Sequence, residues 1–500
     1  MGIIQKQSIR STISISIGFA LGAFNLLVLQ THILTTDQLG LTQMISQLGI
    51  TIATLCTLGS LPVVYKFFPF YKDHLSPQKN DLPFITVTVC LFGFIIMCIA
   101  GYAFRGTIIQ KFSARSPLFV QYSWLVYPFC LFYLLYLWLE GFGWSFKKGA
   151  TSNFLRELLP RILFTLSTVL LILKIISFYQ FLIIFSFSYL LPAISLFIIL
   201  RRTGEFNFNR TISNLTTRLK SKMINFGLFI FGAQFLNLLS RNSDTFILTS
   251  KAERGLTDTA VFMIATYVVT TMDIPQRSIT AISIPILAES WKNKNLKSIS
   301  NIYTKSVANL LIIGLSMFCI ILLNIHNLAI FLGKDYKGIE VVVFFLGLSK
   351  LIDLGTGANA QIIATSNYWK VDFTTTVIFT VLALPLNYIL IAHYGLMGAA
   401  YAQVIAICFY NAMRFGFLWF KFNLQPYTFK DALAIVYAAV AAIACYYIPK
   451  VSNIYADTSI RTIAFCLLFF PAIYFTGVSM EVNEMIKKYL ISLKGIIFRK

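Results

Sequence analysis

Charged residues are scarce in this sequence. Aspartate, glutamate, lysine and arginine make up 12% of its 500 residues, whereas an average soluble domain is about a quarter charged. Hydrophobic residues make up 57%, and the mean hydropathy is +0.75. Apolar stretches long enough to cross about 30 Å of hydrocarbon as helices follow one another from Ser11 to Gly477. Because unpaired backbone cannot face lipid, the sequence predicts an all-α polytopic membrane protein and excludes an ordinary soluble one.

Metal-binding and nucleotide-binding patterns are also missing. The four histidines are scattered, and the eight cysteines lie inside apolar runs without CxxC or Cys/His spacing. This distribution predicts buried thiols rather than a disulfide framework or a zinc site. No GxxxxGK[ST] loop is present, so ATP is not expected to be the direct energy source.

Fourteen apolar runs are recognisable as predicted spans. They lie at about residues 11–34, 40–66, 83–104, 118–141, 155–175, 178–200, 223–249, 259–288, 302–324, 339–363, 370–391, 395–419, 431–449 and 459–478. Lys6 and Arg10 precede the first run, and no small-residue cleavage site follows it, which is typical of an uncleaved first span.

The net charge of +22 is best explained by membrane topology. If the N-terminus is cytoplasmic, most lysines and arginines fall in the inner loops, and this bias predicts that both termini are cytoplasmic. One loop opposes the rule, because Arg105, Lys111 and Arg115 would lie on the outer side. No nucleic-acid partner is expected.

A short repeat suggests that the chain is internally duplicated. The letters ATSN occur at Ala150 and again at Ala364, each followed by a basic residue six positions after the alanine, Arg156 and Lys370. GAFNLLVL from Gly22 resembles GAQFLNLL from Gly232, and SLPVVYKF resembles SIPILAES, in the same order. These landmarks predict two six-helix lobes of parallel topology plus two C-terminal helices.

The predicted domain boundaries follow from this duplication. They are 1–200 for the N-terminal lobe, 201–222 for a cytoplasmic amphipathic linker, 223–421 for the C-terminal lobe, 422–478 for helices 13 and 14, and 479–500 for a cytoplasmic amphipathic tail. The basic, interrupted pattern of the linker and tail indicates segments on anionic headgroups, although a solvated linker would show the same composition.

The clearest family resemblance lies around residues 333–411, and a further motif lies in the seventh predicted span. FLGKDY from Phe331, the segment YGLMGAAYA from Tyr394 and LLSRNSDTFIL from Leu238 resemble motifs of the polysaccharide-transporter, or O-antigen flippase, branch of the multidrug/oligosaccharidyl-lipid/polysaccharide (MOP) exporter superfamily. The resemblance covers about residues 10–480 and implies a MATE-like arrangement of the two lobes.

The resemblance implies a non-enzymatic flippase of the bacterial inner (cytoplasmic) membrane. Its substrate would be an undecaprenyl-pyrophosphate-linked oligosaccharide for O-antigen, capsule or exopolysaccharide, moved by alternating access through a cationic cavity. Expected partners are this substrate, membrane lipids and polysaccharide-assembly proteins, with the monomer as the working unit. No cofactor is expected; a Na⁺ or H⁺ gradient is the candidate energy source.

Ionisable residues inside the predicted spans are the candidate functional residues, because burying a charge in a membrane is costly. The candidates for substrate binding are Arg241, Arg277, Lys350, Arg414, Lys66 and Arg156, and those for ion coupling are Asp244, Asp273, Asp353 and Glu140. Arginine is favoured for phosphate because its guanidinium donates two parallel hydrogen bonds.

The spacing of these charges leaves a structural alternative open. Arg241 and Asp244 are i,i+3 neighbours, as are Lys350 and Asp353, and Asp273 and Arg277 are i,i+4 neighbours. Each pair would share a helix face and could simply neutralise itself within the bundle.

Two other functions are alternatives to the flippase. An ion-coupled multidrug or cation antiporter is expected to bury a carboxylate in the first lobe, but the first predicted span contains Asn25 and Gln30 and no acid. A membrane glycosyltransferase or polymerase usually needs acids or a sizeable domain on the outer side, and the predicted outer loops here are short. A transporter is therefore the favoured interpretation.

Overall fold

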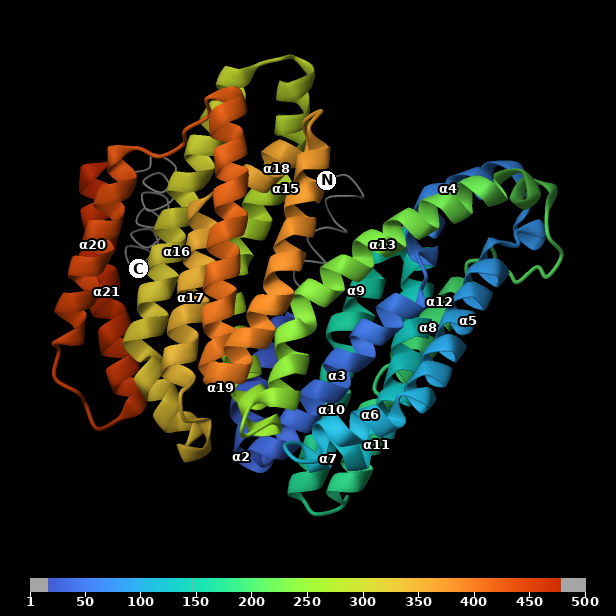
Figure 1. Cartoon of the computed structure of the whole chain (residues 1–500), viewed down its shortest axis with the longest axis horizontal. Coiled ribbons are helices and arrows are strands. Elements are labelled where there is room, and N and C mark those ends of the chain that lie inside the picture. The colour runs from blue at the N-terminus through green and yellow to red at the C-terminus, as the bar shows by residue number, and fades with distance from the viewer. Residues whose placement is uncertain (1–16, 147, 478–500) are drawn as a thin grey trace, which may run out of the picture. The chain divides into compact units, whose positions relative to one another are not determined.

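The computed structural model describes residues 17–146 and 148–477, and every regular element in these ranges is a helix (Figure 1). All fourteen predicted runs coincide with helices, the first from residue 17 onwards. The prediction of an all-α, polytopic, two-lobed fold is therefore confirmed. The amphipathic tail predicted at 479–500 lies outside the described residues.

Eight helical stretches of the described chain are long and apolar enough to cross a membrane by length and composition, and one of them, Lys370–Phe422, contains two predicted spans. Most of the other predicted spans are divided into shorter helices by breaks. Contacts within the chain divide it into two compact units, and the boundary in the sequence lies between Ala260 and Val261. The lobe boundaries predicted from the sequence stay predictions.

The first unit contains the elements up to the end of α13. They are η1 (Phe24–Gln30, a π-helix), α2 (Thr31–Ile33), α3 (Thr36–Cys56), α4 (Ser60–His74), η2 (Pro77–Lys79), α5 (Leu82–Ala103), α6 (Arg105–Phe112), α7 (Pro117–Tyr122), η3 (Ser123–Leu125), α8 (Val126–Ser145), α9 (Gly149–Glu157), α10 (Leu159–Ile172), α11 (Phe178–Ser186), α12 (Leu190–Arg201) and α13 (Asn214–Lys251).

A glycine permits the close crossing of α4 and α13. The break between α3 and α4 places Gly59 at φ 75°, and a Cβ there would lie 2.1 Å from the carbonyl oxygen of Gly227 in α13. Only a residue without a side chain fits both the left-handed backbone and this contact. The glycine therefore fixes how α13 packs in the first unit.

The segment between α12 and α13 is fastened to the first unit. Phe206 is 1% exposed and packs on Trp138 and Phe142. Asp81 accepts hydrogen bonds from the backbone N–H of Ser213 at 2.8 Å and from the hydroxyl of Thr216 at 2.7 Å, which caps the start of α13. Contact of this linker with the membrane surface stays a prediction.

The second unit contains α15 (Asp273–Lys292), α16 (Leu296–Leu332), η4 (Lys334–Tyr336), α17 (Ile339–Gly355), α18 (Asn359–Ala364), α19 (Trp369–Phe422), α20 (Phe429–Tyr446) and α21 (Ile454–Thr476), while α14 (Leu256–Thr270) spans the division. Gly395 has φ 54° and ψ −128°, which breaks α19 into two helices at the boundary that the sequence predicts. A Cβ on Gly398 would lie 2.0 Å from the oxygen of Leu390, so the break also needs a glycine on its far side.

The two C-terminal helices pack against α16 (Figure 1). Arg461 in α21 bonds Asp457 at 2.7 Å and donates to the carbonyl oxygens of Cys445 and Ile448 at 2.9 Å each. Asp457 also accepts from Asn327 of α16 at 2.7 Å. Because this buried pair is fully surrounded by hydrogen-bond partners, it joins α20, α21 and α16 without leaving an isolated charge.

Both ATSN copies lie at helix junctions. The first copy lies at the beginning of α9, and the second begins at the last residue of α18 and continues into the break before α19. In the second copy the hydroxyl of Ser366 accepts from the backbone N–H of Tyr368 at 2.9 Å. The repeat therefore lies at the start of a helix in the first unit and at the end of a helix in the second.

Candidate functional site

The first unit contains a chain of four alternating charges on α8, α9 and α10. Arg156 lies 3.0 Å from Glu140 and 3.2 Å from Glu157, and Glu157 lies 3.0 Å from Arg161. Glu140 is only 3% exposed, so Arg156 supplies the cation that makes its burial tolerable. Two carboxylates and two guanidinium groups give this cluster no formal net charge.

The first helix is joined to this cluster through Asn25. Its side-chain amide donates to the carbonyl oxygen of Arg161 at 3.0 Å and accepts from the hydroxyl of Thr165 at 2.8 Å. Asn25 lies in the π-helix η1, a rare geometry that often accompanies functional positions. Asn25 therefore attaches the first helix to α10 through two hydrogen bonds.

The second unit contains a network centred on Lys350 of α17. Its ammonium lies 2.5 Å from Asp273 of α15 and 2.9 Å from Asp353, and it donates to the side-chain oxygen of Gln276 at 2.8 Å. The i,i+3 pair of Lys350 and Asp353 is thus formed. The i,i+4 partnership of Asp273 with Arg277 is not formed, because Asp273 takes the ammonium of a different helix.

Amide groups complete the hydrogen bonding of Asp353. Asn411 of α19 donates to it at 3.2 Å and Gln276 at 3.3 Å. The oxygen of Asn411 accepts in turn from Thr356 at 2.9 Å and Asn359 at 3.0 Å, next to the break between α17 and α18. A continuous polar network therefore crosses four helices, and it includes two carboxylates but one ammonium.

Arg414 has a separate partner in the second unit. Its guanidinium bonds Asp372 and lies 3.9 Å from the centre of the Tyr410 ring, a cation–π contact. The hydroxyl of Tyr410 lies 3.2 Å from that of Thr376. Arg414 is 7% exposed, so it is held by an acid, Asp372, that the sequence analysis did not single out.

The remaining predicted site residues have different surroundings. Arg277 is exposed and makes no ion pair within the described part of the chain. Lys66 is exposed, with its ammonium 4.0 Å from the centre of the Phe226 ring. Asp244 accepts from its neighbour's backbone N–H, that of Thr245, at 2.7 Å. The Arg241 side chain lies outside the described side chains.

These positions divide the predicted cations into two groups. Lys350, Arg414 and Arg156 are held by carboxylates, whereas Arg277 and Lys66 have none among the described side chains. A phosphate can bind the second group without displacing an acid. Sequence analysis missed Asp372, Gln276 and Asn411, although each is a polar residue within an apolar run.

The described residues contain no cluster of three or more histidine, cysteine, aspartate or glutamate side chains arranged to hold a metal ion. The chemistry available in both units is therefore that of hydrogen bonds and ion pairs among charged and amide groups. Such groups can bind an anion or exchange a proton or an alkali cation.

The fold resembles that of solved membrane transporters. The lipid II flippase MurJ, in an inward closed conformation, aligns with a TM-score of 0.73 and 14% identity over 94% of this chain and 99% of that chain. An inward-facing multidrug resistance MATE family transporter of the MOP superfamily aligns with a TM-score of 0.62 and 12% identity over 84% of this chain and 98% of that chain.

A third similar structure is a MOP superfamily transporter from Pyrococcus furiosus, whose binding pocket is described as having reverse polarity. It aligns with a TM-score of 0.56 and 14% identity over 88% of this chain and 97% of that chain. No protein-family model matches the sequence, and no curated protein matches it significantly. These likenesses show the fold that the chain shares with these transporters.

Proposed function

We propose that this protein is a flippase that moves undecaprenyl-pyrophosphate-linked oligosaccharide across the bacterial inner membrane by alternating access. The observation that carries the proposal is the extent of the fold likeness. The lipid II flippase covers 94% of this chain, whereas the MATE transporter covers 84%. The additional coverage favours a lipid-linked substrate over a small cation.

The unpaired cations support an anionic substrate. Arg277 and Lys66 are exposed and have no carboxylate partner among the described side chains, so each can approach a pyrophosphate at little cost. A positive charge offsets part of the energy needed to move a diphosphate through a medium of low dielectric constant. In this proposal Arg277 and Lys66, each in its own unit, contact the pyrophosphate first. Arg156, Lys350 and Arg414 can bind it only after it displaces the carboxylates with which they are paired.

The proposal carries further expectations about the cell. The product would enter O-antigen, capsule or exopolysaccharide synthesis, both termini would be cytoplasmic, and polysaccharide-assembly proteins would be the partners of a working monomer. The protein would catalyse no covalent step. Reporter fusions after Lys222 and Lys500 should read cytoplasmic, and one after Thr257 should read external.

Transport can be measured with purified protein in liposomes that contain a fluorescent undecaprenyl-pyrophosphate oligosaccharide. Active protein should raise the fraction of sugar that an added glycosidase removes, compared with protein-free liposomes. Equal glycosidase access with and without the protein would contradict the proposal.

An ion-coupled multidrug antiporter is the second candidate, and one observation favours it. The network around Lys350 contains one more carboxylate than ammonium groups, and Asp273 has Lys350 as its partner within the described residues. Asp273 is therefore the carboxylate best placed to take H⁺ or Na⁺. If liposome efflux of ethidium depends on a Na⁺ or H⁺ gradient and Asp273→Asn removes that dependence, while sugar access stays unchanged, the antiporter is the correct function.

The same variant also tests energy coupling in the flippase. Lys350 keeps Asp353 and Gln276 when Asp273 is replaced by asparagine, so the fold should be preserved. We expect sugar access to become insensitive to an imposed gradient. An unchanged response to both Na⁺ and H⁺ gradients would exclude Asp273 as the coupling residue.

A further inference from the structure

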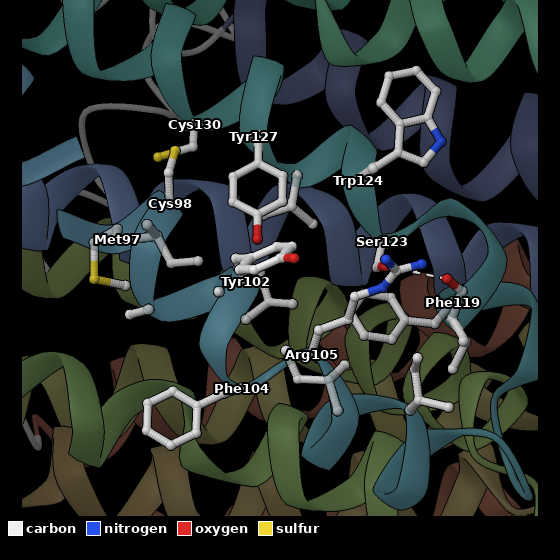
Figure 2. Close-up of a pocket in the computed structure, with 18 of the residues that line it drawn as sticks. Met97, Cys98, Tyr102, Phe104, Arg105, Phe119, Ser123, Trp124, Tyr127 and Cys130 are labelled. Carbon is white, nitrogen blue, oxygen red and sulfur yellow. Dashed lines mark hydrogen bonds between the residues drawn. The ribbon is translucent and has the colours of Figure 1, made fainter. Parts of the chain in front are cut away.

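A large, mainly apolar cavity lies in the first unit (Figure 2). Its volume is about 780 Å³, within the range of roughly 300–1,000 Å³ that is typical of pockets for small organic ligands. Residues of α3, α5, α6, α7 and α8 line it, among them Met97, Cys98, Phe119 and Cys130. None of the four charged residues of the Glu140–Arg156 cluster contributes to its wall.

Arg105 is the one charged residue that lines this mainly apolar cavity. Figure 2 shows its side chain extending beside Phe119 and Ser123. Arg105 forms no ion pair or hydrogen bond with its side chain among the described residues, and no aspartate or glutamate occurs between Asp81 and Glu140. Arg105 is exposed, so its guanidinium is free to donate two parallel hydrogen bonds to an anionic group of a ligand in the cavity.

An acidic segment, the loop before α14 and the start of that helix with Glu253 and Asp258, approaches the turn after α6 but forms no ion pair with Arg105 among the described residues. The loop before α14 contacts the turn after α6, since a Cβ on Gly255 would lie 2.1 Å from the oxygen of Arg115. Asp258 in that segment lies 2.6 Å from Arg254, its own i,i+4 partner. Of the three basic residues in this stretch, Arg105, Lys111 and Arg115, only Arg105 lines the cavity and can meet an anion there.

Four aromatic side chains that line the cavity are also exposed at the protein surface. Tyr102 is 79% exposed, Phe104 63%, Trp124 46% and Tyr127 36%. The hydroxyl of Tyr127 packs over Gly101, where a Cβ would lie 2.1 Å from it. Exposed aromatic rings next to basic residues are typical of the zone where lipid headgroups meet acyl chains.

The adjacent surface of α5 marks the cavity as accessible from the bilayer. Phe92, Ile95 and Ile99 are 59%, 54% and 64% exposed, as expected of a helix face in contact with lipid. The short helix α6 combines exposed Ile109 with Arg105 and Lys111, the composition of a helix lying in the membrane interface. A bilayer lipid can therefore reach the cavity directly.

We propose that this cavity binds an acyl chain of an anionic phospholipid, whose phosphate is held by Arg105. The apolar wall accommodates the chain, and the guanidinium offers two parallel donors to the phosphate oxygens. A bilayer phospholipid fits better than a polyprenyl pyrophosphate, because a single unpartnered cation suits a single phosphate. This site is independent of the transport function proposed above, and it gives a role to Arg105, one of the three basic residues in a loop that the charge bias places outside.

The site can be tested by photo-crosslinking. Purified protein is incorporated into phosphatidylcholine vesicles that contain a trace of phosphatidylglycerol with a diazirine in the middle of one acyl chain. After illumination, mass spectrometry of the peptides locates the label. We expect labelling of residues 94–130, and we expect a phosphatidylcholine probe with the same diazirine to label them about tenfold less.

Matched variants separate the arginine from the general charge of the loop. Arg105→Ala should reduce labelling of residues 94–130 by phosphatidylglycerol about tenfold, whereas Arg105→Lys should retain part of it. Lys111→Ala removes the same charge from the same helix without touching the cavity wall, and it should leave labelling unchanged. Ala100→Phe fills part of the cavity and should reduce labelling with Arg105 intact.

Several results would overturn the proposal. Equal labelling by the two phospholipids would show that the charge is not recognised, and equal effects of Arg105→Ala and Lys111→Ala would show surface attraction alone. Displacement of the label by undecaprenyl phosphate at concentrations where unlabelled phosphatidylglycerol has no effect would assign the cavity to a polyprenyl lipid. Thermal unfolding of each variant in detergent identifies any that has lost its fold, and for such a variant Arg105→Lys provides the comparison.

Discussion

The two units hold their buried charges in different ways. In the first unit, Glu140 and Arg156 form part of a balanced cluster built from a short stretch of chain, and the two partners are 16 positions apart. In the second unit, Lys350 forms ion pairs with two carboxylates, and one of them, Asp273, is 77 positions away in the sequence. Amide donors rather than a second cation complete that network.

This difference indicates where each unit can respond to a ligand. A balanced cluster with no net charge gains little from an added ion, and it mainly fixes the junction of α8 and α9. A network with an excess carboxylate can take up a cation, or lose its ammonium to an incoming phosphate. We therefore assign the structural role mainly to the first cluster and the responsive role to the second, and the following predictions test that assignment.

Lys350→Met should have the largest effect on stability. It leaves two partly buried carboxylates, Asp273 and Asp353, without the cation that they share. Removing one partner of a fully buried ion pair costs about 3–5 kcal/mol, and because water reaches these side chains we expect a loss of about 3–4 kcal/mol. We expect a strongly lowered midpoint of thermal unfolding in detergent and little protein in the membrane. Adding Asp353→Asn should recover part of the stability, because one repulsive charge is then removed; a double variant as unstable as the single one would contradict the network.

Arg156→Ala should be the next most disruptive, with a loss of about 3 kcal/mol, because Glu140 is buried and Arg156 is its ion-pair partner. Combining it with Glu140→Gln should restore most of the lost stability. If the first cluster is purely structural, the double variant should also recover sugar access in liposomes. Restored stability without restored transport would instead give Arg156 a role in substrate binding.

Arg414→Ala should cost about 1–2 kcal/mol. Its partner Asp372 has a side chain that is 31% exposed, so water can solvate the carboxylate that is left behind. Arg414→Lys should keep the charge but weaken the stacking on Tyr410. A thermal midpoint lowered as far as that of Lys350→Met would show that Asp372 is less accessible than the structure indicates.

Arg277→Ala should have the smallest effect on stability, within about 0.5 kcal/mol, because exposed side chains without partners contribute little. Transport should nevertheless fall if Arg277 contacts the pyrophosphate. Asp273→Asn should not rescue it, since Asp273 bonds Lys350 and not Arg277. Normal sugar access in the Arg277→Ala variant would remove this residue from the substrate path.

Sequence reasoning succeeded where the signal is local. Apolar runs locate helices because each must bury its own backbone hydrogen bonds in lipid, and this requirement needs no knowledge of neighbouring helices. The break at Gly395 and the pair formed by Lys350 and Asp353 were predictable for the same reason. Each depends only on residues that are close together in the sequence.

Partners that come from distant helices were not predictable. Asp273 and Arg277 have suitable spacing, yet Asp273 turns to Lys350, and Arg414 is held by Asp372 rather than standing as an unpaired cation. Spacing along one helix reports only which side chains share a face, while the strongest partner is the nearest opposite charge in space.

The sequence by itself therefore determined that this protein is a helical membrane protein, with predicted spans and charges at identifiable positions. Only the tertiary structure decided which of those charges neutralise one another, which cations are left without a carboxylate, and that the unexplained basic loop borders an apolar cavity. The physical reason is range. Helix formation in lipid is imposed residue by residue, whereas ion pairing and cavity shape depend on which helices pack together.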